Sequence, residues 1–146
     1  MLAYISGPLV SSRNLDDARF FYSFLGEICR NCGLNPYIPH NHTDPVAYPD
    51  LSPIEVFDKD FEALVRSEMI IAYIGRPSLG VGAELGIAFQ LGKPVIALHE
   101  SEEKPSRFVL GMLRKAKSCQ IITFKDNNEC GRKLSSILSN FKRQYY

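Results

Sequence analysis

The apolar and polar positions of the chain follow two different periods in turn, which predicts strands alternating with helices. Short apolar runs are typical of buried strands, and they cover residues 2–6, 37–38, 69–74, 94–98 and 120–124. Apolar residues that recur every three or four positions predict helices with one buried face, and they cover residues 14–32, 53–67, 80–91, 106–117 and 129–142. Residues 40–51 are polar and predict a loop.

Five strand–helix units in one short chain predict an α/β fold. The run at 69–74 is unbroken and apolar, as expected of a strand covered on both faces of a parallel sheet. We therefore expect a doubly wound, flavodoxin- or Rossmann-like five-stranded parallel sheet with helices on both faces. No repeat or linker divides residues 1–146, which predicts a single domain. In this class the ligand binds at the carboxyl ends of the strands.

Composition and charge indicate which kinds of molecule the protein is expected to bind. The chain has 146 residues, 45% of them hydrophobic and 23% charged, with a formal net charge of +1. This balance gives no general attraction to nucleic acids or anionic membranes. No apolar run approaches the roughly 20 residues of a membrane helix, and the first residues lack the basic region of a signal peptide. We expect a cytoplasmic protein with a small-molecule site and no nucleic-acid or membrane partner.

The four cysteines do not predict a metal site or a redox pair. Cys29 and Cys32 form a C-x-x-C pattern late in a predicted helix. A redox cysteine pair needs the N-terminus of a helix, where the dipole stabilises the thiolate. We expect buried thiols in a reducing compartment.

The segment after the third predicted strand carries the strongest candidate chemistry. Gly80 and Gly82 allow close approach of the backbone to a ligand. Ser78 and the free N–H groups of the helix start could hold an anion or a sugar hydroxyl. Glu84 is predicted in the first turn of the helix, facing the same crevice. The alternative is that Glu84 only complements the helix dipole.

Two further side chains have both a functional and a structural interpretation. Asp60 lies at the margin of an apolar stripe on the helix at 53–67. It is either a partly buried carboxylate that faces a cleft or an ordinary surface residue. Tyr4 lies on the first strand, on the same side as Ser6. It is either a core tyrosine or a hydrogen-bond donor to Glu84.

Residues 77–86, with the sequence PSLGVGAELG, resemble the signature of the nucleoside 2-deoxyribosyltransferase superfamily. The resemblance is closest to its branch of 2′-deoxynucleoside 5′-monophosphate N-glycosidases. Tyr4 stands in a Tyr-x-x-Gly context that ends at Gly7, Asp60 precedes Glu84 by the family's spacing of 24 residues, and GKPV at 92–95 resembles the family's fourth strand. The resemblance covers roughly residues 2–124.

The resemblance implies roles for these residues. Glu84 is then the nucleophile, Asp60 the acid/base group and Tyr4 an orienting hydroxyl, with no metal or organic cofactor. The implied substrate-binding residues are Gly7, Ser78, Gly80, Gly82, His42 and Met112. The implied reaction cleaves the N-glycosidic bond of a (2′-deoxy)nucleoside or its 5′-monophosphate through a covalent glycosyl–Glu84 ester. Water then releases the sugar, or another base accepts it. The alternative is a non-catalytic nucleotide-binding or sensor module of the same fold.

The chain departs from the family where the 5′-phosphate is held. The family's first-strand loop reads Gly-Ser-Ile-Arg, whereas this chain has Gly7-Pro8-Leu9-Val10. A further family serine falls on Leu110. The residues Ser11, Ser12 and Arg13 follow closely and could substitute.

Two segments predict features around the site. The loop with His40, His42 and Asp44 either covers the site and contacts the base or is a solvated loop, and a metal site is a weaker alternative. Residues 106–112 match the region with which family members complete the active site of a neighbouring subunit. Phe108 and Met112, one turn apart, form an apolar patch there. We therefore expect a homodimer or a higher homo-oligomer.

Overall fold

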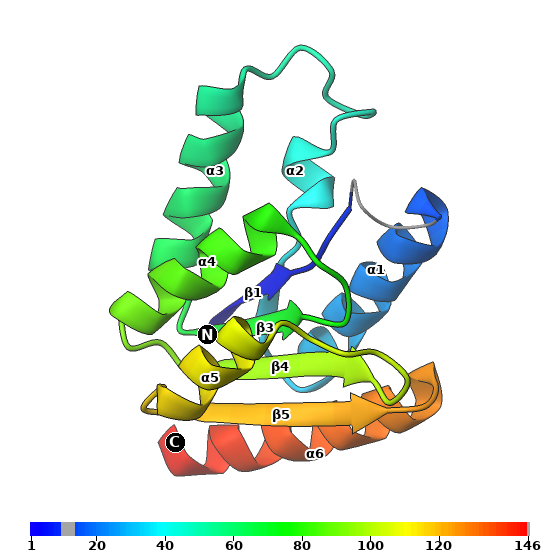
Figure 1. Ribbon diagram of the computed structural model, residues 1–146, viewed down its shortest axis with the longest axis vertical. Coiled ribbons are helices and arrows are strands. Elements are labelled where there is room, and N and C mark those ends of the chain that lie inside the picture. The colour runs from blue at the N-terminus through cyan, green and yellow to red at the C-terminus, as the bar shows by residue number, and fades with distance from the viewer. Residues whose placement is uncertain (10–13, 146) are drawn as a thin grey trace.

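The sheet of this protein has the strand order β2-β1-β3-β4-β5, and all its neighbouring strands are parallel (Figure 1). The computed structural model describes residues 1–9 and 14–145, and their side chains as far as Phe141. Within that part, the strands are β1 (Leu2–Ser6), β2 (Asn35–Tyr37), β3 (Met69–Tyr73), β4 (Val95–Glu100) and β5 (Cys119–Phe124). The predicted parallel α/β sheet is confirmed.

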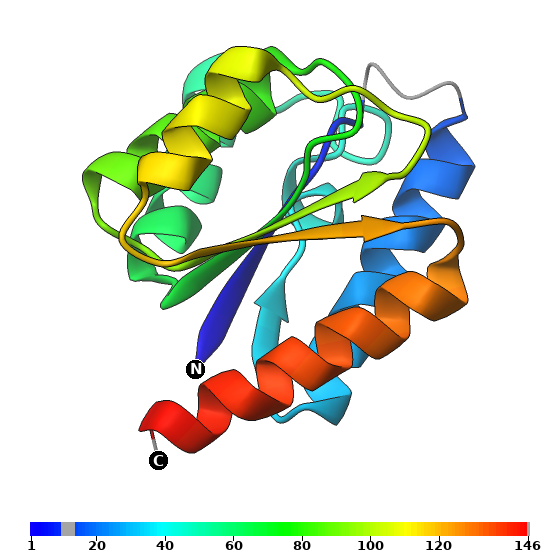
Figure 2. The same ribbon diagram turned by 60° about the horizontal axis from the view of Figure 1, so that its bottom comes forward.

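The helices cover both faces of the sheet, as predicted. They are α1 (Leu15–Asn31), α2 (His40–Thr43), α3 (Pro53–Arg66), α4 (Leu79–Gln90), α5 (Arg107–Lys115) and α6 (Asn127–Tyr145). Figure 2 shows α1 and α6 on one side of the sheet and α3, α4 and α5 on the other. The short helix α2 lies where the polar pattern predicted only a loop. No helix in the described ranges is long and apolar enough to span a membrane.

Alternation along the strands divides the core into two clusters. Ala3 and Ile5 pack with α1 and α6, whereas Tyr4 packs on the opposite face with α3, α4 and α5. Every residue of β3 is buried, because this strand is covered on both faces. Tyr4 and Ser6 therefore point to the side of the sheet from which α4 approaches.

Side-chain caps fix where α3 and α4 begin. Ser52 and Glu55 form the predicted capping box of α3. At α4, Ser78 is the N-cap and accepts a hydrogen bond from the Val81 N–H at 3.3 Å. The helix therefore begins at Leu79, and Glu84 lies in its second turn. The prediction of a first-turn glutamate was wrong, and the helix-dipole interpretation of Glu84 loses its basis, since that effect fades beyond the first turn.

The strand order places a topological switch point beside β1. The chain leaves β1 towards β2 on one side, and β3 pairs with β1 on the other. In doubly wound sheets a crevice opens at such a point, at the carboxyl ends of the strands. Glu84 lies on the helix that follows β3, Ser6 is the last residue of β1, and Tyr4 stands two residues before it, so all three lie close to this crevice.

Candidate active site

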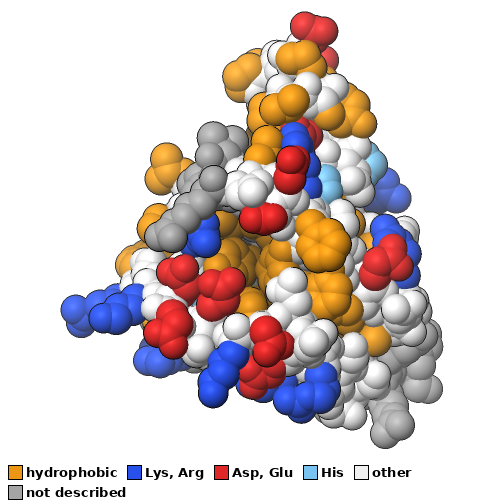
Figure 3. Space-filling view, turned by 90° about the vertical axis from the view of Figure 1, so that its right-hand side faces the viewer, with side chains coloured by type: hydrophobic (Ala, Val, Ile, Leu, Met, Phe, Trp, Pro, Cys, Tyr) orange, Lys and Arg blue, Asp and Glu red, His pale blue; other side chains and the backbone are white. Residues whose placement is uncertain are grey.

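A cavity of about 430 Å³ opens at the switch point. This volume is in the range of small-molecule sites. The residues around it come from β1, from helices α1, α2, α3 and α4, and from the segments that follow β1, β2, β3 and α2. They include Gly7, Leu9, Tyr22, Pro39, His40, Thr43, Val56, Asp60, Ser78, Gly80 and Glu84. The carboxyl ends of the strands face the viewer in Figure 3, where hydrophobic side chains wall a hollow and acidic side chains stand at its edge.

The first strand holds the Glu84 carboxylate at two points. The Tyr4 hydroxyl donates a hydrogen bond to Glu84 Oε1 at 2.7 Å, and the Ser6 hydroxyl donates to Oε2. Tyr4 and Ser6 are fully buried. The predicted bond from Tyr4 is present, whereas Ser6 was not predicted to contribute. Its position two residues after Tyr4, on the same face of the strand, was the available signal.

A second carboxylate, Asp60 on α3, is held on the same cavity. The Tyr37 hydroxyl at the end of β2 donates to Asp60 Oδ1 at 2.9 Å. Thr43 Oγ1 lies 3.0 Å from Asp60 Oδ2 and also 3.0 Å from the Pro39 carbonyl oxygen. Of the two interpretations left open for Asp60, the structure shows the partly buried carboxylate that faces a cleft. Neither Tyr37 nor Thr43 was singled out from the sequence.

Burial dominates the electrostatics of the carboxylate pair. Burial raises the pKa of Glu84, and the nearby charge of Asp60 raises it further. The hydrogen bonds from Ser6 and Tyr4 lower this pKa and so oppose the rise. Burial likewise raises the pKa of Asp60 against the hydrogen bonds from Tyr37 and Thr43. The pKa of Tyr4 is raised far above its usual range, chiefly by burial, so Tyr4 stays a neutral donor. A carboxyl whose pKa is raised keeps its proton closer to neutral pH, as a proton donor in catalysis requires.

The glycine and serine positions of the predicted site are split between two cavities. Gly7, Ser78 and Gly80 line the cavity that contains Glu84. At Gly7 a Cβ would lie 2.2 Å from the Tyr22 ring, so this position requires glycine. Gly82 instead lines a neighbouring cavity, which shares Ser78 with the first.

His42 and Met112, which were predicted to contact the substrate, do not line this cavity. His42 is exposed, and its ring stacks on Tyr37 with centroids 4.6 Å apart. His40 lines the cavity in its place. Its Nδ1 is buried without a hydrogen-bond partner among the described residues. Met112 lies on α5 and packs with the core on that side.

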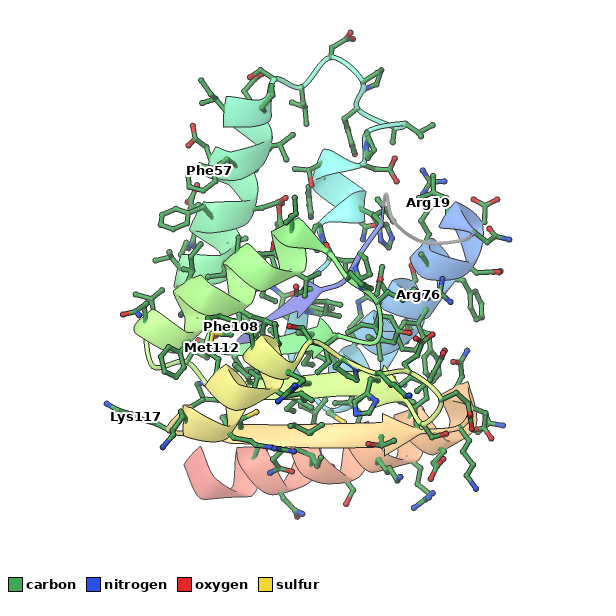
Figure 4. All side chains as sticks on the ribbon, in the orientation of Figure 1. Arg19, Phe57, Arg76, Phe108, Met112 and Lys117 are labelled. Carbon is green, nitrogen blue, oxygen red and sulfur yellow. The ribbon has the colours of Figure 1, made fainter. Side chains whose placement is uncertain are left out.

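An ion pair ties the segment that follows α2 to α1. Asp44 is 2% exposed and accepts hydrogen bonds from Arg19 Nε at 2.7 Å and Nη2 at 2.8 Å, and from the Val46 N–H at 2.8 Å. These bonds lower the pKa of Asp44 to about 2. Figure 4 shows Arg19 on α1 beside this segment. Asp44 is thus engaged by Arg19, and no group of three metal-ligating side chains occurs in the part of the chain that the structure describes.

Fold and site together define a class of protein. It is a flavodoxin-like α/β protein in which two carboxylates share one cavity at the switch point, and tyrosine hydroxyls hold both of them. Paired carboxyl groups, one attacking and one supplying a proton, are the chemistry of glycoside cleavage.

Comparison with known proteins gives the family. Residues 3–129 match the model of the nucleoside 2-deoxyribosyltransferase family, and the chain belongs to this family. A protein of Thermofilum pendens named as a 2′-deoxynucleoside 5′-phosphate N-hydrolase is 34% identical over 90 residues, which cover 60% of this chain and 62% of the relative. The 5-hydroxymethyl-dUMP N-hydrolase of Rattus norvegicus is 36% identical over 61 residues, which cover 42% of this chain and 36% of the relative. The chain thus spans less than two thirds of either relative.

Solved structures share the fold. The CMP N-glycosidase of Clostridium botulinum has a TM-score of 0.74 and 18% identity, with 94% of this chain and 99% of that chain covered. A 2-deoxyribosyltransferase of Bacillus psychrosaccharolyticus has a TM-score of 0.66 and 20% identity, with 94% and 96% covered. At these identities the likeness concerns the arrangement of strands and helices.

Proposed function

We propose that this protein cleaves the N-glycosidic bond of a nucleoside or nucleotide, with Glu84 as nucleophile and Asp60 as proton donor. The observation that carries the proposal is the Glu84 carboxylate held by two hydroxyl donors in a cavity that also contains Asp60. A sensor module would need neither carboxylate. The names of the relatives support the same bond type.

The proposed reaction has two steps. In the first, a Glu84 oxygen bonds to C1′ of the sugar while the C1′–N bond breaks and its electron pair leaves with the base. Asp60 gives its proton to the departing base. Tyr4 and Ser6 hold the carboxylate in the orientation for attack. In the second step water, or a second base, attacks C1′, the bond from C1′ to the Glu84 oxygen breaks, and the proton of the attacking group passes to the Asp60 carboxylate. None of these steps needs a metal or an organic cofactor.

The direct test is to supply a panel of deoxyribonucleosides, ribonucleosides and their 5′-monophosphates and to follow free base by chromatography. Intact-mass measurement of the protein during turnover should show an adduct of one glycosyl group on wild type and none on Glu84→Gln. No base release from any member of the panel would overturn the proposed function.

The phosphate prediction follows from the walls of the cavity. No lysine or arginine among the described residues lines the cavity that holds Glu84, and Pro8 stands where the family has serine. Residues 11–13, the predicted substitutes, lie outside the described part of the chain. We therefore expect nucleosides to be turned over at least as well as their 5′-monophosphates. Comparison of kcat/KM for each pair checks this, and a monophosphate preference above about tenfold, or 1.4 kcal/mol, would contradict it.

A homo-oligomer is the second part of the proposal, because α3, α4 and α5 leave apolar side chains uncovered. The predicted stripe of α3 buries Leu64 but leaves Phe57 56% exposed and stacked on Phe61. On α5, Phe108 is 83% exposed. Figure 4 shows Phe57, Phe108 and Met112 on the side of the molecule away from Arg19 and Arg76. Ile54 and Val65 of α3, Leu79 of α4 and Leu91 at the C-terminus of α4 are exposed as well. Exposed apolar side chains on these helices support an interface with a second copy.

Introducing a charge at one of these positions should separate the subunits. We expect Phe57→Lys to raise the dissociation constant by roughly thirtyfold or more, since a central aromatic contributes about 2 kcal/mol. Light scattering at micromolar concentration measures the mass. Phe20→Lys is the matched control, because Phe20 is 67% exposed on α1, on the opposite side of the sheet. A fully active wild-type monomer would refute an active site shared between subunits.

We also propose a cytoplasmic location. It is supported by the cysteines, which the structure contains as thiols, two of them in the core.

A further inference from the structure

Two stacked tyrosines hold the two carboxylates from adjacent strands. Tyr4 on β1 and Tyr37 on β2 are direct partners in the sheet register. Their rings stack with centroids 5.5 Å apart and an interplanar angle of 18°. Tyr4 donates to Glu84 and Tyr37 to Asp60. The sheet therefore sets the spacing of the two hydroxyls, and through them the relative placement of the two carboxylates.

Tyr37 is fixed on its other side as well. The His42 ring stacks on it with an interplanar angle of 8°, so the Tyr37 ring lies between Tyr4 and His42. The other neighbour of Asp60, Thr43, has a single hydroxyl proton for two acceptors, Asp60 and the Pro39 carbonyl. Within residues 1–9 and 14–141, the Tyr37 hydroxyl donates to Asp60 alone. Tyr37 thus donates its proton to Asp60, whereas the Thr43 proton is shared between Asp60 and the Pro39 carbonyl oxygen.

We propose that Tyr37 is a positioning residue of the reaction, which orients Asp60 and stabilises the negative charge that appears on it. The inference rests on the proposed role of Asp60 as proton donor. When the proton moves from Asp60 to the base nitrogen and Glu84 bonds to C1′, the negative charge of Glu84 is lost and one appears on Asp60. The Tyr37 O–H already points to that oxygen, so no reorganisation is needed.

The groups that act on Asp60 come from every element around it. His42 on α2 and Lys59 on α3 favour its charged form, whereas the charge of Glu84 on α4 lies close enough to couple with it. The Tyr4 and Tyr37 hydroxyls have raised pKa values and stay neutral. Burial raises the pKa of Asp60, and the bond from Tyr37 opposes this rise. Removing that bond alone therefore moves the pKa of Asp60 further upward.

The first test needs no substrate. The side-chain carboxyl of Asp60 is titrated by ¹³C NMR in the full chain, with its signal assigned through its loss in Asp60→Asn. We expect Asp60 to titrate at higher pH in Tyr37→Phe than in wild type. Tyr48→Phe is the control. Tyr48 follows the short helix α2, and its hydroxyl donates to the Asn41 carbonyl oxygen rather than to Asp60. An unchanged Asp60 titration in Tyr37→Phe overturns the inference, and this outcome is independent of whether the wild type releases base.

The second test separates positioning from packing. Tyr37→Phe keeps the stacked ring, so we expect kcat to fall roughly tenfold, the effect of one hydrogen bond to a charged group, with KM within about twofold. The alkaline limb of the pH profile should move to higher pH. For an N7-methylated purine nucleoside, whose base leaves without protonation, kcat should be nearly the same in Tyr37→Phe as in wild type. An equal loss on both substrates with an unmoved limb would mean that the hydroxyl serves packing only.

Discussion

Replacing Glu84 with glutamine abolishes base release while the fold is retained. The variant keeps the size of the side chain and an oxygen that can accept from Tyr4, but it lacks the charge and the nucleophilic oxygen that bonds to C1′. We expect kcat to fall by about 10⁴-fold or more, which is ~5.4 kcal/mol in the barrier. Free base measured by chromatography gives the loss, and thermal unfolding followed by circular dichroism confirms the fold.

A matched glutamate elsewhere controls for the substitution itself. Glu62→Gln makes the same change on the exposed surface of α3, where Glu62 forms an exposed ion pair with Arg66. Its turnover should equal that of wild type. Wild-type turnover in Glu84→Gln, or an unchanged glycosyl adduct in its mass spectrum, would remove Glu84 from the role of nucleophile.

The second large effect is expected at Asp60. Asp60→Asn keeps an acceptor for the Tyr37 hydroxyl but has no proton to give. General acid catalysis contributes about 10²–10⁴-fold, so we expect a loss in that range for ordinary nucleosides. For an N7-methylated purine nucleoside the loss should be much smaller, because its base leaves without a proton.

The pH profile gives an independent measure of the same role. The acid must be protonated, and burial raises the pKa of Asp60 above its ordinary value. Wild-type activity should therefore decline as the pH rises through that raised pKa, and Asp60→Asn should lack this alkaline limb. Equal losses on both substrates, with the alkaline limb kept, would assign the proton to another group.

The fold and the centre of the site could be predicted because they depend on local patterns. The spacing of apolar residues predicted the alternation of strands and helices, and the unbroken apolar run at 69–74 identified β3. Alternation along β1 put Tyr4 towards the helix after β3, and its bond to Glu84 follows from that placement. Ser6 obeys the same alternation and could have been included. Glu84 was placed one turn too early, since Ser78 rather than a later residue caps the helix.

The surroundings of Asp60 could not be predicted, because they depend on contacts between distant segments. The polar sequence of residues 40–51 does not indicate where this segment lies in the fold. Its position is fixed by the hydrogen bonds that Arg19 on α1 donates to Asp44. That path brings Thr43 and His40 to the cavity and turns His42 outwards onto Tyr37. The stripe of α3 shows the same limit. Periodicity indicates an apolar face but not which part of it the protein's own core covers, and Phe57 remains exposed.

The ion pair between Arg19 and Asp44 also decides what a pH titration of this protein can report. The pKa of Asp44 is about 2, so its contribution to stability is present above the ordinary carboxyl range and is lost only as the pH falls through that value. The segment anchored to α1 therefore keeps its electrostatic anchor across the weakly acidic, neutral and weakly alkaline range. Over that range the Arg19–Asp44 pair keeps both charges, so a change in turnover there does not come from the loss of this anchor.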